Sequence, residues 1–274
     1  MTPTALPLTE MPAPQFVMSP EGHRIATYSW GEDAAPTVLC VHGFASSCQD
    51  NWVSTGWVRD LTRAGFRVLG VDQRGHGASD KPHDPHDYTM DALVGDLEIV
   101  LDTYMLDSVL YAGYSLGGRV GWQFLVDRPD RVTRGILGGI PDGRPLARLK
   151  IAQARAFVED GTPIEDKVTQ NYVTLAERVP GNDLRVLVAL AEGMRLGDAD
   201  PDPRRPPQQP VLFATGSEDA ILEASRQLAA AAPRGQFVVI PDRHHFNTPG
   251  SRVFRSEAVA YLTGVGSAPA PQAQ

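Results

Sequence analysis

The sequence predicts an α/β fold, in which helices cover both faces of a doubly wound, mostly parallel sheet and one helical segment is inserted. Short apolar runs rich in β-branched residues alternate with longer segments of helical spacing, which is typical of parallel sheets. The alternation stops once and then resumes, which indicates the insertion. The chain has 274 residues, of which 42% are hydrophobic, so it can bury the core of one large domain.

The first two strands should form an antiparallel hairpin. Residues 16–18 and 24–30 flank the segment "SPEG", whose proline and glycine favour a turn. Buried parallel strands are expected next, because three short runs rich in β-branched or aromatic residues each precede a glycine-containing turn. These runs are residues 37–41, 66–71 and 108–111.

Two helices should follow the second and third of these strands. Residues 90–104 place six apolar side chains on one helical face. Residues 117–126 are the second candidate helix, which ends before Pro129. Residues 132–137 are a further candidate strand.

The segment 142–209 is helical and charged in pattern, and it ends in a proline-rich stretch at 201–210. The alternation then resumes with a strand, a helix, a strand and a helix at 210–215, 221–231, 236–240 and 251–262. The ends of the chain are rich in Pro and Ala and bury little apolar surface. The expected units are a core formed by 15–141 and 210–264, a helical cap at 142–209, and disordered tails at 1–14 and 265–274.

The protein is acidic, with a formal charge of −8 at pH 7 and a pI of about 5.3. Nucleic acid and anionic membrane surfaces would repel it, so the expected partner is a small neutral or apolar molecule. The N-terminus lacks the basic start and continuous apolar stretch of a signal peptide, and no run of about eighteen apolar residues occurs. A cytoplasmic location is therefore expected. Nothing in the sequence predicts an oligomeric state.

The two cysteines, Cys40 and Cys48, match neither a disulfide framework nor a zinc or redox motif. Cys40 lies in an apolar run and is expected to be a buried core thiol. Cys48 lies in a loop and is a candidate for exposure.

The stretch "AGYSLGG" at 112–118 contains the pattern Gly-x-Ser-x-Gly. The pattern is weak alone, but here it falls between a predicted buried strand and a predicted helix. A nucleophilic serine in such a turn has a strained backbone and needs small neighbours, which Gly113 and Gly117 supply. The helix N-terminus also favours the negative charge that would develop there. Ser115 is therefore the predicted nucleophile.

A serine hydroxyl needs a base, and the sequence offers seven histidines. These are His23, His42, His76, His83, His86, His244 and His245. His42 and His76 follow predicted strands. The His42 ring is expected to hydrogen-bond nearby backbone, and His76 is expected to be a structural contact near the site. His244 and His245 follow the last predicted strand, where the chain order serine, acid, histidine places the base. His245 is favoured because a phenylalanine follows it directly, and His244 is the alternative.

The base in turn needs an acid to orient it. The segment "ATGSEDA" places Glu218 and Asp219 just after the predicted strand at 210–215, and sites in α/β sheets form at such carboxyl ends. Asp219 is favoured. Asp142 is the alternative, although a turn before Gly143 would also explain an aspartate at that position.

The motifs "VHGF", "DQRGHGASD", "GYSLGG", "GSEDA" and "RHHF" occur in this order over residues 16–263. In order and spacing the chain resembles the α/β-hydrolase fold superfamily, in its capped branch of esterases, lactonases and C–C bond hydrolases. The resemblance implies that Ser115 attacks, His245 acts as base and then acid, and Asp219 orients the imidazole. It implies an oxyanion hole formed by the backbone N–H groups of Phe44 and Leu116. The chain departs from the family at 243–244, where Gly or Asp often stands.

These residues predict a serine hydrolase that cleaves a carboxylic ester or lactone of a small to medium, largely apolar substrate through an acyl-enzyme on Ser115. Such chemistry requires no metal or cofactor. A serine in place of an aspartate disfavours the dehalogenase and epoxide hydrolase reactions of the same fold. The alternatives are a C–C bond hydrolase or perhydrolase with the same triad, and a receptor-like protein with little turnover. Candidate substrate contacts, for which core packing is equally expected, are Phe44, Trp52, Trp57, Tyr114, Phe157, Tyr172 and Leu187.

Overall fold

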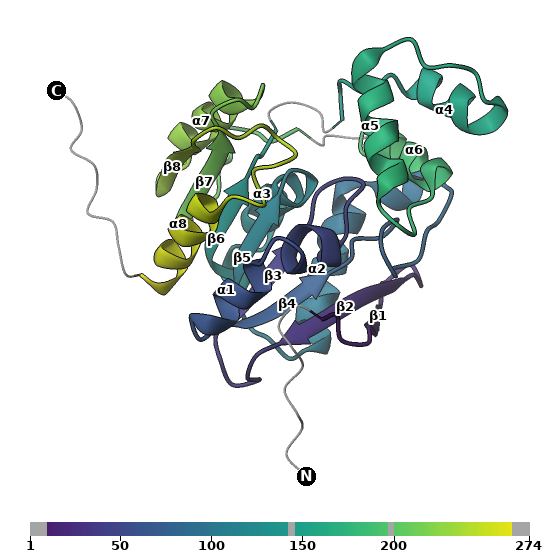
Figure 1. The fold of residues 1–274 in the computed structure, drawn as a ribbon. Helices are drawn as coiled ribbons and strands as arrows, with labels where there is room; N and C mark the ends of the chain where they lie inside the picture. Colours follow the sequence, from purple (N-terminus) through teal and green to yellow (C-terminus); the bar gives the residue numbers. More distant parts are fainter. Residues whose placement is uncertain (1–9, 142–145, 197–199, 265–274) are drawn as a thin grey trace.

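A computed structural model describes residues 10–141, 146–196 and 200–264. Over these residues the chain forms one eight-stranded sheet in the order β1-β2-β4-β3-β5-β6-β7-β8 (Figure 1). The strands are β1 (Gln15–Met18), β2 (Arg24–Trp30), β3 (Thr37–Val41), β4 (Arg67–Val71), β5 (Val109–Tyr114), β6 (Val132–Gly138), β7 (Val211–Gly216) and β8 (Gly235–Ile240). Only the β1–β2 and β2–β4 pairings in this sheet are antiparallel.

Helices cover both faces of the sheet. The helices are α1 (Trp57–Arg63), α2 (Met90–Thr103), α3 (Leu116–Asp127), α4 (Ile151–Asp160), α5 (Lys167–Arg178), α6 (Leu184–Gly193), α7 (Leu222–Ala231) and α8 (Arg252–Thr263), with shorter turns η1 (Gln49–Val53), η2 (Pro85–Tyr88) and η3 (Pro129–Arg131). Apolar residues of α2, α3 and α7 join the core on one face, and those of α1 and α8 join the core on the other. The predicted doubly wound α/β fold is confirmed.

The side chains of the fully buried strand β3 pack into the hydrophobic cores on both faces of the sheet. Leu39 and Val41 belong to the core under α2, α3 and α7, whereas Val38 and Cys40 belong to the core under α1 and α8. Successive side chains of a strand point to opposite faces, so a strand covered on both sides is apolar throughout. This is why β3 appears in the sequence as one continuous apolar run.

The predicted hairpin pairs as expected, and the other predicted strands and core helices match within three residues. Two features of the region after β3 differ from expectation. The sequence analysis assigned no helix to 57–63, where the structure has α1. The exposure considered for Cys48 is wrong, because Cys48 is fully buried and its Sγ fills the space beside Gly70 of β4.

The chain between β6 and β7 carries α4, α5 and α6, which group beside one edge of the sheet (Figure 1). Their place agrees with the predicted helical pattern of 142–209, while the division into core and cap remains a prediction. Of the predicted tails, residues 1–9 and 265–274 lie outside the described residues. In the described part of the first tail, the Glu10 carbonyl oxygen accepts a hydrogen bond from the Trp30 indole at 3.1 Å. None of the helices that the structure describes is long and apolar enough to cross a membrane.

Helix α6 connects the inserted helices to the core. The Asp183 side chain caps its N-terminus, and its C-terminal residue Gly193 lies against η2. A Cβ atom on Gly193 would lie 2.1 Å from the Pro85 carbonyl oxygen. Because this is far inside van der Waals distance, the backbone of α6 can approach η2 only through a glycine.

We expect Gly193→Ala to destabilise the protein by about 1–3 kcal/mol, because the clash with Pro85 outweighs the better helix propensity of alanine. Gly95 of α2 is the matched control, since a Cβ there meets nothing within 4 Å. Gly95→Ala should instead stabilise by up to about 1 kcal/mol. Urea unfolding of both variants and the wild type measures the difference. A Gly193→Ala protein as stable as the wild type would show that α6 does not pack this closely.

Candidate active site

Ser115 lies in the sharp turn between β5 and α3. Its backbone φ is 53° and its ψ is −112°, a conformation that costs a residue with a side chain about 1–3 kcal/mol. The Ser115 N–H donates to the Gly138 carbonyl oxygen at 2.8 Å, and the Arg119 N–H donates to the Ser115 carbonyl oxygen at 2.9 Å. These bonds hold the serine just beyond the end of β5, at the N-terminus of α3.

Two glycines let this turn pack against β3. A Cβ atom on Gly117 would lie 2.1 Å from the Val41 carbonyl oxygen, and one on Gly113 would lie 2.3 Å from the Gly117 carbonyl oxygen. Both distances are far inside van der Waals contact, so only glycine fits at either position. The expected need for small residues around the serine is confirmed.

The structure brings Ser115, His245 and Asp219 together from the ends of three strands. His245 Nε2 lies 2.8 Å from Ser115 Oγ, and His245 Nδ1 lies 2.8 Å from Asp219 Oδ2. Asp219 is only 7% exposed, and its other oxygen accepts from the Ile221 N–H at 3.1 Å. In the neutral tautomer whose Nδ1–H donates to this carboxylate, Nε2 can accept a hydrogen bond from the serine hydroxyl. This arrangement can pass the serine proton to the imidazole.

The alternative residues are placed differently. His244 is exposed, and its Nδ1 accepts from the Phe246 N–H at 3.3 Å. Glu218 lines the same cavity, but the carboxylate bonded to His245 is that of Asp219. Asp142 lies outside the described residues.

Tyr114 supports the loop that carries His245. Its hydroxyl donates to the His245 carbonyl oxygen at 2.5 Å, and the two ring centroids are 5.5 Å apart. Burial raises the pKa of Tyr114 above its ordinary value, so the phenol keeps its proton. The sequence suggested Tyr114 only as an apolar contact. The hydrogen bond was missed because 131 positions separate its partners.

The loop after β3 carries the Phe44 backbone N–H toward the cavity that Ser115 also lines. The N–H groups on either side of it have acceptors. The Gly43 N–H donates to Asn51 Oδ1 at 3.2 Å. The Ala45 N–H donates to His76 Nε2 at 3.0 Å, and the Ser46 N–H donates to the Gly43 carbonyl oxygen at 3.3 Å. Within the described residues, the Phe44 N–H has no protein acceptor, and Phe44 lines the cavity with Ser115. It is therefore available to an outside oxygen.

The turn at Ser115 has the same feature. The Gly117 N–H donates to the His42 carbonyl oxygen at 3.0 Å, and the Ser115 N–H is used by Gly138. The Leu116 N–H between them has no acceptor among the residues that the structure describes, and Leu116 also lines the cavity. Free N–H groups at a helix N-terminus attract negative charge.

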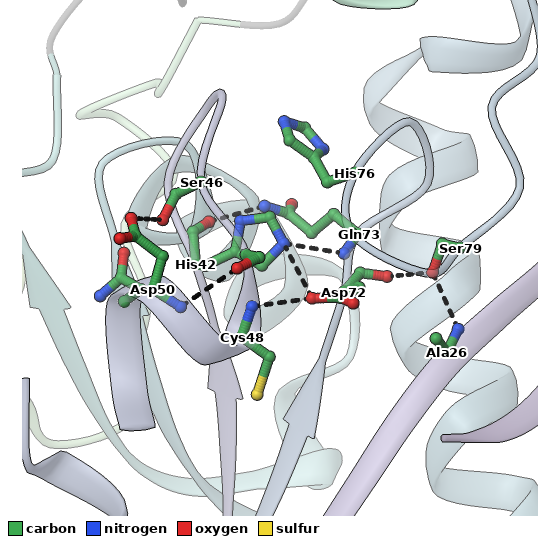
Figure 2. A network of polar contacts seen from close by, with 12 residues as sticks. Ala26, His42, Ser46, Cys48, Asp50, Asp72, Gln73, His76 and Ser79 are labelled. Carbon is green, nitrogen blue, oxygen red and sulfur yellow. Dashed lines mark hydrogen bonds and ion pairs between the residues drawn. The ribbon is translucent and has the colours of Figure 1, made fainter. Parts of the chain in front are cut away.

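His42 and His76 hold the backbone of this region, as the sequence predicted. His42 Nδ1 donates to the Gly43 carbonyl oxygen at 2.7 Å, and its Nε2 accepts from the Gln73 N–H at 3.1 Å (Figure 2). His76 Nε2 accepts from the Ala45 N–H. Complete burial lowers the pKa of His42 and lowers that of His76 well below the ordinary value. Both rings are therefore neutral, and their nitrogens bond to backbone groups, whereas the ring nitrogen bonded to Ser115 belongs to His245.

Asp72, at the end of β4, is the centre of the polar network in Figure 2. Its carboxylate accepts from the backbone N–H groups of Cys48 at 2.7 Å and Ala78 at 2.9 Å, and from the Tyr28 hydroxyl at 2.9 Å. It thus ties the loop after β3 to the loop after β4. Sequence reasoning did not single out Asp72, although it is the first residue of the motif "DQRGHGASD".

A cavity of about 470 Å³ opens over Ser115. Its walls come from the loops after β3, β5, β6, β7 and β8 and from the inserted segment. The Tyr172 ring of α5 lies 6.1 Å from both the Phe44 and the Phe246 rings, so three aromatic side chains surround the cavity. Across the described part of the chain, no three His, Cys, Asp or Glu side chains are grouped to hold a metal ion.

Of the suggested substrate contacts, Phe44 and Tyr172 line this cavity. The others are packed elsewhere. Trp52 and Trp57 lie in the core with rings 5.2 Å apart, and Phe157 and Leu187 pack in two small clusters of the inserted segment.

We expect the free energy of unfolding to fall as the pH drops below 6.5. Unfolded histidines take up protons there, whereas His42 and His76 stay neutral in the folded protein, so the unfolded state binds more protons. Each contributes up to about 1.4 kcal/mol per pH unit, until the pH reaches its folded-state pKa. Urea unfolding between pH 7 and roughly pH 5.5 measures this slope. His76→Gln, which can still accept from Ala45, should lose about half of it, and an unchanged slope would contradict the assignment.

The alpha/beta hydrolase fold family model matches residues 36–179, just over half of the chain. A Bacillus subtilis protein described as a putative 2-succinyl-6-hydroxy-2,4-cyclohexadiene-1-carboxylate synthase is 32% identical over 123 residues, 45% of this chain and 43% of that protein. Epoxide hydrolase B of Mycobacterium tuberculosis is 36% identical over 110 residues, 39% of this chain and 29% of that protein. The chain thus spans less than half the length of these curated relatives.

Solved structures share the fold at low sequence identity. The enol-lactonase from Burkholderia xenovorans LB400 has a TM-score of 0.74 at 22% identity, covering 91% of this chain and 100% of that one. A thermophilic esterase from Thermogutta terrifontis has a TM-score of 0.73 at 23% identity, covering 93% of this chain and 100% of that one. These structures show a shared fold, and the match of the family model to just over half of the chain shows that it belongs to the α/β-hydrolase fold family.

Proposed function

We propose that this protein is a serine hydrolase that cleaves carboxylic esters or lactones through an acyl-enzyme on Ser115. The observation that carries the proposal is the hydrogen-bonded chain from Asp219 through His245 to Ser115, which ends at the floor of the cavity. A nucleophile, a base within hydrogen-bond reach and a third group that orients the base together form the arrangement used for acyl transfer.

In the first step, Ser115 Oγ attacks the ester carbonyl carbon while His245 Nε2 takes the hydroxyl proton. The buried Asp219 carboxylate stabilises the imidazolium that forms. His245 then gives the proton to the departing alkoxide, which leaves as the alcohol, and the acyl group stays on Ser115. In the second step, a water molecule transfers its proton to His245 and attacks the acyl carbon. The acid departs and Ser115 regains its proton.

The unpaired N–H groups of Phe44 and Leu116 are the proposed oxyanion hole. The attacked carbonyl oxygen becomes negatively charged, and two fixed donors can receive it without reorganisation. Removal of one such donor costs about 3 kcal/mol in known cases. The hydrogen bonds that occupy the neighbouring N–H groups support the assignment, since they leave these two free.

The residue at the turn favours ester hydrolysis over the reaction named for several relatives. Curated relatives of this chain include epoxide hydrolases. In the α/β-hydrolase superfamily that the sequence resembles, opening of an epoxide needs a carboxylate nucleophile. This chain has Ser115 there instead. Among the structurally similar proteins, an esterase and an enol-lactonase are named for reactions of the type proposed here.

The proposed substrate is a small molecule with an apolar acyl or alkyl part. A cavity of about 470 Å³ is in the range of small-molecule sites. The aromatic rings of Phe44, Tyr172 and Phe246 would pack against such a group close to Ser115.

A panel of p-nitrophenyl esters of increasing acyl length should be hydrolysed by the wild type. Ser115→Ala should lower kcat at least about 10⁴-fold, because the nucleophile is lost. Ser256→Ala, an exposed serine of α8, is the matched control and should behave as the wild type. No turnover of any ester by the wild type would contradict ester hydrolysis and favour C–C bond cleavage or ligand binding. Unchanged turnover in Ser115→Ala would exclude it as the nucleophile.

The two adjacent histidines give a sharper test of the base. His245→Ala should reduce kcat about as severely as Ser115→Ala, since the two act as one unit. His244→Ala should cost less than about tenfold, because its ring does not touch Ser115. Asp219→Asn should lower kcat by about 10⁴-fold. A larger loss in His244→Ala than in His245→Ala would overturn the assignment.

A further inference from the structure

The inserted segment contacts the loop after β3, which carries the Phe44 N–H of the proposed oxyanion hole and is called the oxyanion loop below. The contact is made by Asn182, which lies between α5 and α6. Asn182 Nδ2 donates to the Ala45 carbonyl oxygen at 2.9 Å and to the Ala176 carbonyl oxygen at 3.0 Å. Two carbonyl acceptors fix the orientation of the amide, because a flip would place Oδ1 against both of them. The apolar contacts of Ala45 with Ala176 and Leu187 surround the same spot.

Ala45 is a strained residue whose conformation depends on its neighbours. Its φ is 57°, in the left-handed region that costs a non-glycine residue about 1–2 kcal/mol. Its N–H donates to His76, and its carbonyl oxygen accepts from Asn182. The core therefore holds one side of Ala45, and the inserted segment holds the other.

A directed series of hydrogen bonds leads from Asn182 to the Phe44 N–H. Asn182 donates to the Ala45 carbonyl oxygen, and this carbonyl belongs to the same peptide group as the Ser46 N–H. The Ser46 N–H in turn donates to the Gly43 carbonyl oxygen at 3.3 Å. The Gly43 carbonyl in turn shares a peptide plane with the Phe44 N–H. In a planar trans peptide the N–H and C=O point in opposite directions, so holding the Gly43 oxygen aims the Phe44 N–H the other way.

The same series should strengthen the donor. A peptide group whose carbonyl oxygen accepts a hydrogen bond becomes polarised, and its N–H becomes a better donor. Here every carbonyl in the series accepts, first from Asn182 and then from Ser46, and the Gly43 carbonyl also accepts from His42 Nδ1. The Phe44 N–H is the open end of this series.

We propose that Asn182 is a positioning residue that orients and polarises the Phe44 N–H, so that the inserted segment completes the oxyanion hole. The inference rests on the proposed function. Through Ala176, Asn182 also holds the C-terminal turn of α5, the helix that carries Tyr172 to the cavity. The same side chain thus contacts both the C-terminal turn of α5 and the loop that carries the Phe44 N–H, while the apolar contacts of Ala176 and Val173 also hold α5 in place.

Two variants test the proposal on the full-length protein. Asn182→Asp keeps the shape but removes both donors, and Asn182→Ala removes the side chain. Each should lower kcat by about tenfold or more with KM within about twofold, because the missing interaction acts on the transition state. Affinity for a trifluoromethyl ketone, which forms a tetrahedral adduct with serine, should fall by a similar factor. Titration of active sites with a phosphonate would normalise kcat to folded protein.

Gln153→Ala is the matched control. Gln153 is another amide of the inserted segment, and its Oε1 accepts from the Glu165 and Asp166 N–H groups without touching the oxyanion loop. Its loss should leave kcat and ketone affinity within about twofold of the wild type.

The outcomes separate this inference from the function on which it rests. If the wild type hydrolyses esters through Ser115 but the Asn182 variants keep kcat and ketone affinity, the positioning role is wrong and the hydrolase proposal stands. A rise in KM with unchanged kcat, or an equal loss in Gln153→Ala, would also overturn the positioning role. If the wild type hydrolyses no ester, the proposed function itself is wrong.

Discussion

The site depends on one backbone constraint, the close approach of the turn at Ser115 to strand β3. Gly117 lies against the Val41 carbonyl, and Gly113 lies against Gly117, at distances that exclude any side chain. This packing accompanies the strained conformation of Ser115 at the start of α3, where the adjacent Leu116 N–H has no acceptor within the described part of the chain. A larger residue at either glycine would move the serine, the helix N-terminus and the free donor together.

Hydrogen bonds of the neighbouring residues fix the position of the Phe44 N–H, the second donor of the proposed oxyanion hole. The buried neutral rings of His42 and His76 form hydrogen bonds with the backbone of the loop after β3. Asp72 accepts from N–H groups of the loops after β3 and β4 and so ties these loops together (Figure 2). Most buried polar groups are hydrogen-bonded, and each of these bonds restricts the conformation of the loop. Among the described residues, the Phe44 N–H has no acceptor. The inserted segment contributes to the same network through Asn182.

Local sequence patterns predicted most of the fold, because apolar runs and glycine turns mark buried strands such as β3 and β5. Helix α1 was missed because it is short and has no side-chain cap. The burial of Cys48 was missed because it depends on Gly70 of a neighbouring strand. For the site, chain order suggested Ser115, Asp219 and His245, and the structure places them in contact. Their catalytic roles stay a prediction. Asn182 gave no signal, because only the folded chain brings it to Ala45.

Covalent labelling can show whether Ser115 is a nucleophile that His245 activates. Incubation with an alkyl fluorophosphonate, followed by intact mass and peptide mapping, would locate the reactive oxygen. We expect one phosphonyl group per chain, on the peptide that contains Ser115, with fluoride released and a much slower reaction in His245→Ala. Stoichiometric labelling of a different residue, or no labelling of the folded wild type, would contradict it.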